Sequence, residues 1–411
     1  MKVKSESEYI INLVEKDIKR YCNSYLLKKQ ITGSEYLTTS LLLVNNDTRN
    51  ILKKINIFEE LLAKIIQKDI PKKIVIDKSH ISIIEGQMSY IVGFLLLATE
   101  FEANISMKQK FENIFFEMCA IKINDSYQNL YSKSVRKSDY DLMYGLSGIL
   151  NFLTSFEFLD KSKEIEIKDE IINYMYKLGT KTQWGGGGLF ILRDFLPIQQ
   201  KDKYPNGHFD LGYAHGLLGV ISALKKAQIP LITNKRVHPL LKLLKENIRE
   251  DYSIPGIVAP EETPTYENNI SWCYGLVGFQ NSINLLDNSE VNYLGIDLKD
   301  LDRNFQSILK LYYSNSKNTH FSTIMCHGIS NELYHVFKYK HKYYNISEMQ
   351  NELVSYILKY TSGHYGECLF KDWDNSVSPI EDIINGSIGA DLAILSVLKE
   401  VEFKGDFIFG Y

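Results

Sequence analysis

A short glycine motif recurs along this chain and precedes an apolar run each time. Clear copies, Gly-x-x-Gly, begin at Gly145, Gly216 and Gly275, and variants begin at Gly328 and Gly386. A looser copy, Ser89-Tyr-Ile-Val-Gly93, comes before the run FLLLA. The mean step between copies is about 59 residues. An internal repeat of this length indicates that one structural unit is stacked several times.

A step of this length accommodates two helices with their connections. The run after each glycine motif is apolar nearly all round, which is typical of a buried helix. The intervening stretches, for example Pro239–Glu250 and Leu301–Tyr312, carry apolar residues at three- and four-residue spacing, as a helix with one solvated face does. Helix pairs of this kind close into a ring or run as a solenoid. We therefore expect an all-α fold.

The segment Lys181–Asp210 interrupts this pattern. It contains four consecutive glycines and two prolines, which favour an extended excursion or hairpin over a helix. It could be a long surface loop, a lid or a peptide-docking segment, and His208 and Asp210 could border a functional site. No low-complexity linker divides the chain elsewhere, so we expect residues 1–411 to form a single domain.

Charge and cysteine content exclude several classes of protein. A net charge of −3 gives no electrostatic reason to expect a nucleic-acid partner. Five cysteines spread over 411 residues do not form the pattern of a secreted disulfide framework. The charged N-terminal segment lacks the apolar core of a signal peptide. We expect a cytoplasmic protein, and peripheral association with the inner face of the cell membrane remains compatible with these features.

Two cysteines and a histidine stand out by their position in the repeat. Cys273 lies in Trp272-Cys273-Tyr274-Gly275, and the triplet Cys326-His327-Gly328 follows at the equivalent point of the next copy. Two thiolates and an imidazole suit zinc, and three protein ligands are typical of a catalytic site with one open position. Cysteines are more often small buried residues. The matching repeat positions favour a zinc site here.

A second histidine occupies the same repeat position as His327. His215, in Ala214-His215-Gly216, could be a fourth zinc ligand, an acid/base group or a buried core histidine. We favour the acid/base role, because histidine titrates near neutral pH. Asp141 could orient His215 or cap a helix. Tyr274 follows a candidate ligand and could line the pocket.

These motifs resemble those of the lanthionine synthetase C-like family, the cyclases of class I lantibiotic biosynthesis. The resemblance is carried by Trp272-Cys273-Tyr274-Gly275, Cys326-His327-Gly328, Ala214-His215-Gly216, and Tyr140-Asp141 ahead of Gly145. It implies an α/α toroid of seven inner and seven outer helices with one zinc ion at its mouth. It also implies a small peptide-binding excursion, to which Lys181–Asp210 would belong. Six repeats can be counted, so the seventh is assumed.

The resemblance also assigns roles to residues. It makes Cys273, Cys326 and His327 the zinc ligands and places Tyr274 close to the site. It makes His215 and Asp141 the residues that handle protons. One position departs from the family pattern, because Asn269 stands where an arginine is often found three residues before the tryptophan.

The implied reaction is a zinc-dependent addition of peptide cysteine thiols to dehydroalanine or dehydrobutyrine, which forms lanthionine and methyllanthionine rings. A free thiol has a pKa of about 8.5, and a metal ion deprotonates it. With Cys273 and Cys326 as thiolates, the bound substrate sulfur keeps excess negative charge and remains nucleophilic. This ligand set therefore suits thiol alkylation.

Two other functions remain open from the sequence. One is zinc-dependent addition of glutathione to dehydroamino acids, and the other is a zinc-stabilised helical scaffold that binds peptides. For a cyclase, the expected partners are a dehydrated precursor peptide, a dehydratase and an exporter in a membrane-associated complex.

Overall fold

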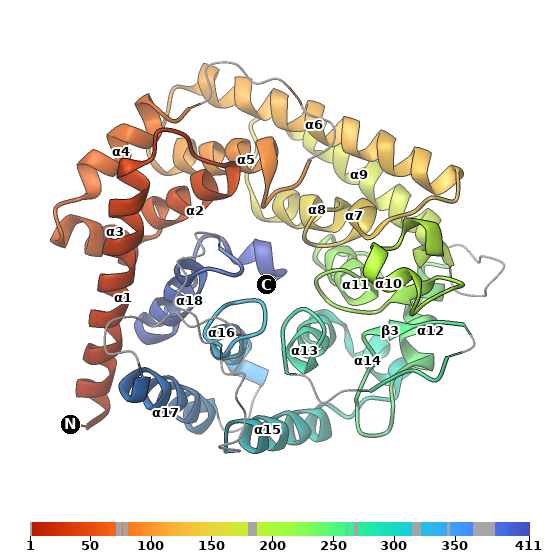
Figure 1. The fold of residues 1–411 in the computed structure, drawn as a ribbon. Helices are drawn as coiled ribbons and strands as arrows, with labels where there is room; N and C mark the ends of the chain where they lie inside the picture. Colours follow the sequence, from red (N-terminus) through yellow and green to blue (C-terminus); the bar gives the residue numbers. More distant parts are fainter. Residues whose placement is uncertain are drawn as a thin grey trace. The chain divides into compact units, whose positions relative to one another are not determined.

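A computed structural model shows a predominantly helical protein (Figure 1), which confirms the expected all-α class. It describes residues 2–70, 76, 81–179, 187–260, 262–266, 270–314, 322–342, 346–364 and 383–411. Within these ranges no helix has both the length and the apolar character that crossing a membrane requires. The chain divides into two compact units, and the single domain expected from the sequence stays a prediction.

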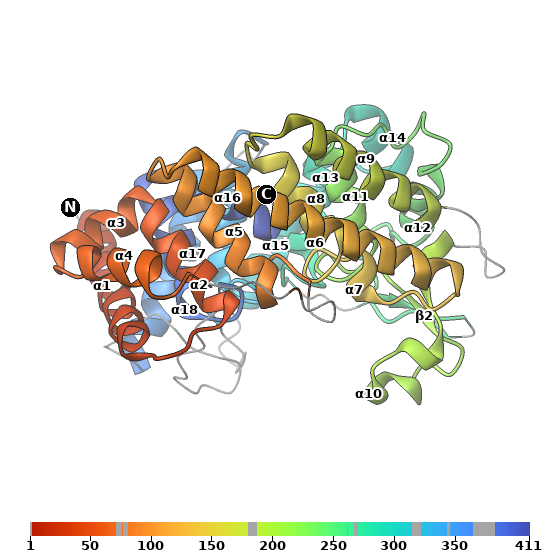
Figure 2. The same cartoon turned by 90° about the horizontal axis from the view of Figure 1, so that it is seen from above.

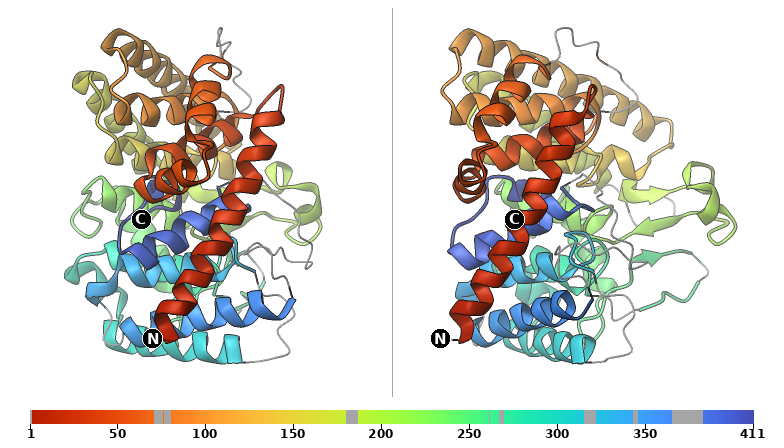
Figure 3. Two further views of the ribbon diagram at one scale, coloured as in Figure 1. Left: turned by 90° about the vertical axis from the view of Figure 1, so that its left-hand side faces the viewer. Right: turned by 60° about the vertical axis from the view of Figure 1, so that its left-hand side comes forward.

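The first unit comprises Met1–Val75, Glu85–Phe111 and Leu309–Asp406. Its helices are α1 (Lys2–Leu27), α2 (Gly33–Val44), α3 (Asn46–Lys54), α4 (Phe58–Gln67), α5 (Gly86–Glu100), α16 (Ile329–Lys338), α17 (Ile346–His364) and α18 (Ser387–Lys399), with a 3-10 turn η3 (Lys340–Lys342). Helix α2 packs on α5, and α16 packs on α17 and α18. Helix α1 packs along α18 (Figure 3).

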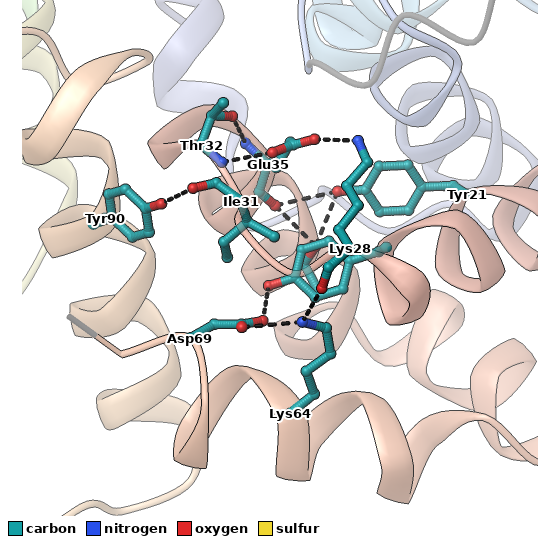
Figure 4. Close-up of polar contacts among 10 residues, drawn as sticks. Tyr21, Lys28, Ile31, Thr32, Glu35, Lys64, Asp69 and Tyr90 are labelled. Carbon is teal, nitrogen blue, oxygen red and sulfur yellow. Dashed lines mark hydrogen bonds and ion pairs between the residues drawn. The ribbon is translucent and has the colours of Figure 1, made fainter. Parts of the chain in front are cut away.

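Polar contacts tie the first helices of this unit together (Figure 4). The Tyr25 hydroxyl donates to the Asp69 carboxylate over 2.8 Å, and Lys64 Nζ donates to the same carboxylate over 3.0 Å. The Tyr21 hydroxyl donates to the Glu35 carbonyl over 3.1 Å. Buried polar groups need such partners, so these bonds fix α1 against α2 and α4.

The second unit comprises Ile76–Ile84, Glu112–Ile308 and Phe407–Tyr411. Its helices are α7 (Lys137–Tyr140), α8 (Leu146–Ser155), α9 (Lys161–Leu178), α10 (Ile198–Lys201), α11 (Leu217–Lys226), α12 (His238–Glu246), α13 (Leu276–Leu285) and α14 (Asn288–Leu294). Helix α11 packs on α8, α12 and α13. Helices α6 (Ile105–Tyr131) and α15 (Leu298–Ser314) contribute residues to both units, as does the 3-10 turn η4 (Asp406–Phe409).

The glycine motifs that begin at Gly145, Gly216, Gly275, Gly328 and Gly386 stand at the start of buried helices, as expected. The first glycines are the N-caps of α8, α11, α13, α16 and α18 (Gly145, Gly216, Gly275, Gly328, Gly386). The second glycine permits close backbone approach. A Cβ on Gly219 would lie 2.3 Å from the Tyr213 carbonyl oxygen, and one on Gly278 would lie 2.2 Å from that of Trp272.

One assignment of the repeat was wrong. Helix α5 begins at Gly86, so Gly93 lies inside this helix and not at its start. The motif-like segment is therefore Gly86-Gln-Met-Ser89, in which serine replaces the second glycine. In the Gly328 copy, Asn331 takes the place of that glycine and is buried.

The excursion is described from Gly187 onward, because residues 180–186 lie outside the described ranges. Its elements are η1 (Gly187–Leu189), β1 (Phe190–Ile191), η2 (Arg193–Phe195), α10 and β2 (His208–Asp210), and β2 also pairs antiparallel with β3 (Ile257–Val258). The expected hairpin is present as the antiparallel pair β1–β2, but the segment also contains the short helix α10. Figures 2 and 3 show α10 and the strands standing apart from α8, α11 and α13.

Candidate active site and metal-ligand cluster

Backbone hydrogen bonds join the segments that precede the buried helices of the second unit. The Leu142 amide donates to the Ala214 carbonyl over 3.0 Å, and the Tyr213 amide donates to the Cys273 carbonyl over 2.7 Å. In the first unit, the Cys326 amide donates to the Ile384 carbonyl over 3.2 Å. These segments carry the side chains selected from the sequence, so the repeat brings equivalent positions together.

Asp141 and His215 form a direct pair. The Nδ1 atom of His215 lies 2.7 Å from Oδ2 of Asp141, whose side chain is fully buried. The other carboxylate oxygen accepts a hydrogen bond from the Tyr144 amide over 2.6 Å. Asp141 therefore orients His215 and also fixes the turn before α8, while the N-cap of that helix is Gly145. With Nδ1 engaged, Nε2 is the ring nitrogen left for proton exchange.

The surroundings of His215 favour its charged form. Burial by itself lowers the pKa of His215, but the hydrogen bond and charge of Asp141 and the charge of Asp210 outweigh it and raise that pKa. The charge of Lys137 acts in the opposite direction. The Tyr144 ring stacks on the imidazole at a centroid distance of 6.0 Å and an angle of 12°. His215 consequently holds its proton to a higher pH than a free histidine does.

A second ionic cluster lies beside this pair. The buried carboxylate of Asp210 contacts Lys137 Nζ at 2.5 Å and accepts hydrogen bonds from the Tyr274 hydroxyl at 2.8 Å and the Gly212 amide at 2.9 Å. Lys137 also donates to the Tyr274 hydroxyl over 3.2 Å. Burial and the Asp210 charge raise the pKa of Tyr274, so its hydroxyl stays protonated as a donor.

The sequence pointed to only part of this cluster. Tyr274 was expected near the site, and its ring centroid lies 6.1 Å from that of His215. Asp210 was marked only as a residue that could border the site, and Lys137 belongs to no motif. His208 is buried, with its Nε2 atom 3.3 Å from the Gln200 side-chain oxygen, and burial lowers the pKa of this histidine to about 4.

The three predicted metal ligands are divided between the two units. Cys273 lies before α13 in the second unit, and Cys326 and His327 lie before α16 in the first. The two cysteines are buried and the histidine is half-buried. The Cys273 thiol also donates to the Ser271 hydroxyl over 3.6 Å. Two thiols and an imidazole are residue types that bind zinc.

A cavity of about 350 Å³ is lined by Tyr274 and by residues of the excursion. Its lining includes Gln200, Tyr204, Ile254, Ile257, Thr265 and Tyr274. The lining mixes apolar and polar side chains, as ligand sites commonly do. The Tyr274 side chain therefore belongs both to this cavity and to the ionic cluster beside His215.

Comparison with known proteins identifies the family. The family model described as "Lanthionine synthetase C-like protein" matches residues 39–407. This chain belongs to the lanthionine synthetase C-like family. The resemblance carried by the cysteine and histidine motifs is thereby confirmed. Asn269, where the family often has an arginine, lies outside the described residues.

This chain is similar to two named proteins. The nisin biosynthesis protein NisC of Lactococcus lactis subsp. lactis is 29% identical over 168 residues, which cover 37% of this chain and 39% of that protein. This match therefore spans less than half of the curated relative. The solved structure of nisin cyclase matches with a TM-score of 0.69 and 17% identity, over 98% of this chain and 97% of that one. The expected α/α toroid is confirmed at the level of the fold, and the count of seven repeats stays a prediction.

Proposed function

We propose that this protein closes thioether rings in a dehydrated precursor peptide, by adding cysteine thiols to dehydroalanine and dehydrobutyrine. The observation that carries the proposal is the Asp141–His215 pair. The pair comes from the same set of repeat positions as Cys273, Cys326 and His327. Membership of the family and the fold shared with nisin cyclase support it.

The donor set fits zinc. In the proposal Cys273, Cys326 and His327 hold one ion, and a bound zinc ion would deprotonate an incoming peptide thiol. Because two of the three ligands would be thiolates, the incoming sulfur would keep excess negative charge and remain nucleophilic. His215 is engaged with Asp141 through Nδ1, which favours a proton-handling role for it over that of a fourth ligand.

Ring closure also requires a proton donor. When sulfur bonds to the β-carbon of the dehydro residue, the carbon–carbon double bond opens and an enolate forms. Its α-carbon then takes a proton from Nε2 of the His215 imidazolium. The raised pKa of His215 suits this step, because it keeps the donor charged to a higher pH than a free histidine. Asp141 orients the ring and stabilises its positive charge, and the proton released by the substrate thiol restores the imidazolium for the next ring.

The substrate needs a surface beside the reacting groups. We assign this role to the cavity lined by Tyr274 and by residues of the excursion, where a peptide segment flanking the reacting residues would lie. Its half-polar lining suits a peptide, which offers backbone polar groups and apolar side chains together. The dehydratase and exporter expected as partners, and a peripheral place at the membrane, belong to this same proposal.

The test is incubation of the protein with a dehydrated precursor peptide, followed by mass spectrometry. Ring closure leaves the peptide mass unchanged and protects its thiols from alkylation, whereas glutathione addition increases the mass. His215→Ala should retain zinc and slow ring closure by about 10²–10⁴-fold. The matched control is His238→Ala, because His238 lies on α12 and its ring contacts Tyr293.

Three outcomes would contradict the proposal. Thiols that remain open to alkylation with the zinc-loaded protein would exclude a cyclase. Glutathione adducts would replace it with the intermolecular reaction. A loss of zinc in His215→Ala would move this histidine into the ligand set and favour a zinc-stabilised scaffold.

A further inference from the structure

Lys137 and Asp141 belong to one helical turn. Helix α7 begins at Lys137, and the Asp141 amide donates to the Lys137 carbonyl over 2.9 Å. The two side chains nevertheless bind different partners, since Asp141 holds His215 and Lys137 holds Asp210. One turn of helix therefore supplies both groups. It places the Asp141 carboxylate against the His215 imidazole, and it places the Lys137 ammonium group against the Asp210 carboxylate.

Asp210 needs this cation because its side chain is fully buried. An unpaired carboxylate in such a place carries a large desolvation penalty. The Gly212 amide and the Tyr274 hydroxyl supply hydrogen bonds, but Lys137 is the positive charge among these three partners. Its removal would leave a buried negative charge close to His215.

The same ammonium group positions Tyr274. The tyrosine hydroxyl donates to Asp210 and accepts from Lys137, so both of its hydrogen-bonding functions are used. Two directed bonds fix the ring more tightly than one. This ring contacts the His215 imidazole and also lines the cavity, so its position affects how a substrate in that cavity meets the imidazole.

We propose that Lys137 is a positioning residue for ring closure: it neutralises Asp210, so that His215 shares its proton with Asp141 alone, and it fixes the Tyr274 ring, which contacts His215 and lines the peptide cavity. The proposal rests on the cyclase function proposed above and assigns that site a residue with no motif of its own.

The groups that face His215 come from four segments. They are Asp141 and Lys137 of the α7 turn, Asp210 of β2, Tyr144 before α8 and Tyr274 before α13. Asp141 and Asp210 favour the imidazolium, whereas Lys137 opposes it. Loss of Lys137 should therefore make His215 hold its proton to higher pH.

The experiment compares the zinc-loaded wild type with Lys137→Met, Lys137→Arg and Lys225→Met. Lys225 is a matched control, because its ammonium lies 2.8 Å from the buried Glu290 carboxylate. It lies nine residues after Gly216 along α11, about 13 Å from the helix start. Removing it breaks a comparable ion pair without changing the surroundings of His215.

Two quantities are measured for each variant. The first is the titration of the His215 ring by NMR, with the signal assigned by its loss in His215→Asn. The second is the rate of ring closure against pH at saturating peptide. For Lys137→Met we expect a His215 titration displaced to higher pH and a maximal rate lowered by about 10–100-fold. Lys137→Arg should keep the His215 titration and the maximal rate close to their wild-type values, and Lys225→Met should alter neither quantity.

The two proposals fail in different ways. If the wild type closes no rings, the cyclase function is wrong, while the titration still reports on Lys137. If the His215 titration is the same in Lys137→Met and wild type, or if Lys225→Met shifts it equally, the inference about Lys137 is overturned. An unchanged rate at saturating peptide in Lys137→Met would equally overturn it.

Discussion

The indole nitrogen of Trp272 donates a hydrogen bond to the carbonyl of Phe409 over 3.0 Å, although the two residues are 137 positions apart. The Tyr213 hydroxyl donates to the next carbonyl, that of Gly410, over 3.1 Å. Residues 407–411 therefore bind the segments that carry Cys273 and His215. The buried Trp272 ring lies directly before the candidate ligand Cys273.

Trp272→Phe should lower the free energy of unfolding by about 1–3 kcal/mol, through loss of this hydrogen bond and of indole volume. Urea denaturation followed by circular dichroism measures the change. The Asn281 side chain also donates to the Phe409 carbonyl, over 3.4 Å, which keeps the expected cost moderate. A variant as stable as the wild type would show that the hydrogen bond from Trp272 to Phe409 contributes nothing to the free energy of unfolding.

Asp141→Asn should remove a pH-dependent part of the stability. Because the folded-state pKa of His215 is raised, its protonation stabilises the fold at pH values below the unfolded pKa of about 6.5. This contribution is lost as pH rises through the folded-state pKa. We expect the free energy of unfolding of the wild type to exceed that of the variant. The difference should be largest near pH 6 and smaller toward pH 9. A difference that is constant with pH would contradict the raised pKa.

Cys326→Ala should abolish stoichiometric zinc binding, since it removes one of the three proposed zinc ligands. Zinc per chain is measured by elemental analysis after dialysis. Cys119→Ala is the control, because Cys119 is also buried and its thiol pKa is raised by burial. That variant should lose stability but keep its zinc. Equal zinc content in wild type and Cys326→Ala would remove this cysteine from the ligand set.

Glu332→Gln should stabilise the protein at alkaline pH. Burial raises the pKa of Glu332 to about 8, although its hydrogen bond with the Tyr313 hydroxyl opposes the shift. An acid that is harder to ionise in the folded state stabilises the fold at low pH, and this contribution is lost between pH values of about 4.5 and 8. The variant should therefore gain stability over the wild type as pH rises through that window. Parallel stability profiles for the two proteins would disprove it.

The helical repeat could be predicted because its signal is local. The glycines at 145, 216 and 275 each precede an apolar run, and each caps a buried helix. Gly93 was misplaced for the same reason. A glycine within an apolar run looks the same in sequence whether it begins a helix or packs inside one, and here its missing Cβ makes room for the Tyr36 and Ser40 side chains of α2.

The chemistry of the site was predictable where residue types are distinctive. Cysteine and histidine at equivalent repeat positions indicated a metal site. Asp141, before a glycine motif, could be a partner of His215 or a helix cap, and the sequence did not decide between the two. Lys137 could not be found this way. Lysine is common on any helix, and nothing near it in sequence reveals that a carboxylate 73 positions later lies 2.5 Å from its ammonium group.

The amino-acid sequence alone determined that the chain forms paired helices with cysteine and histidine side chains ahead of the buried ones, because helix periodicity and glycine caps are properties of neighbouring residues. The tertiary structure decided which charges face one another. Whether His215 meets Asp141, and whether Asp210 is neutralised by Lys137, depends on segments that are far apart in the chain and are joined by contacts between repeats. Charge interactions fall off with distance in space and not with distance along the chain.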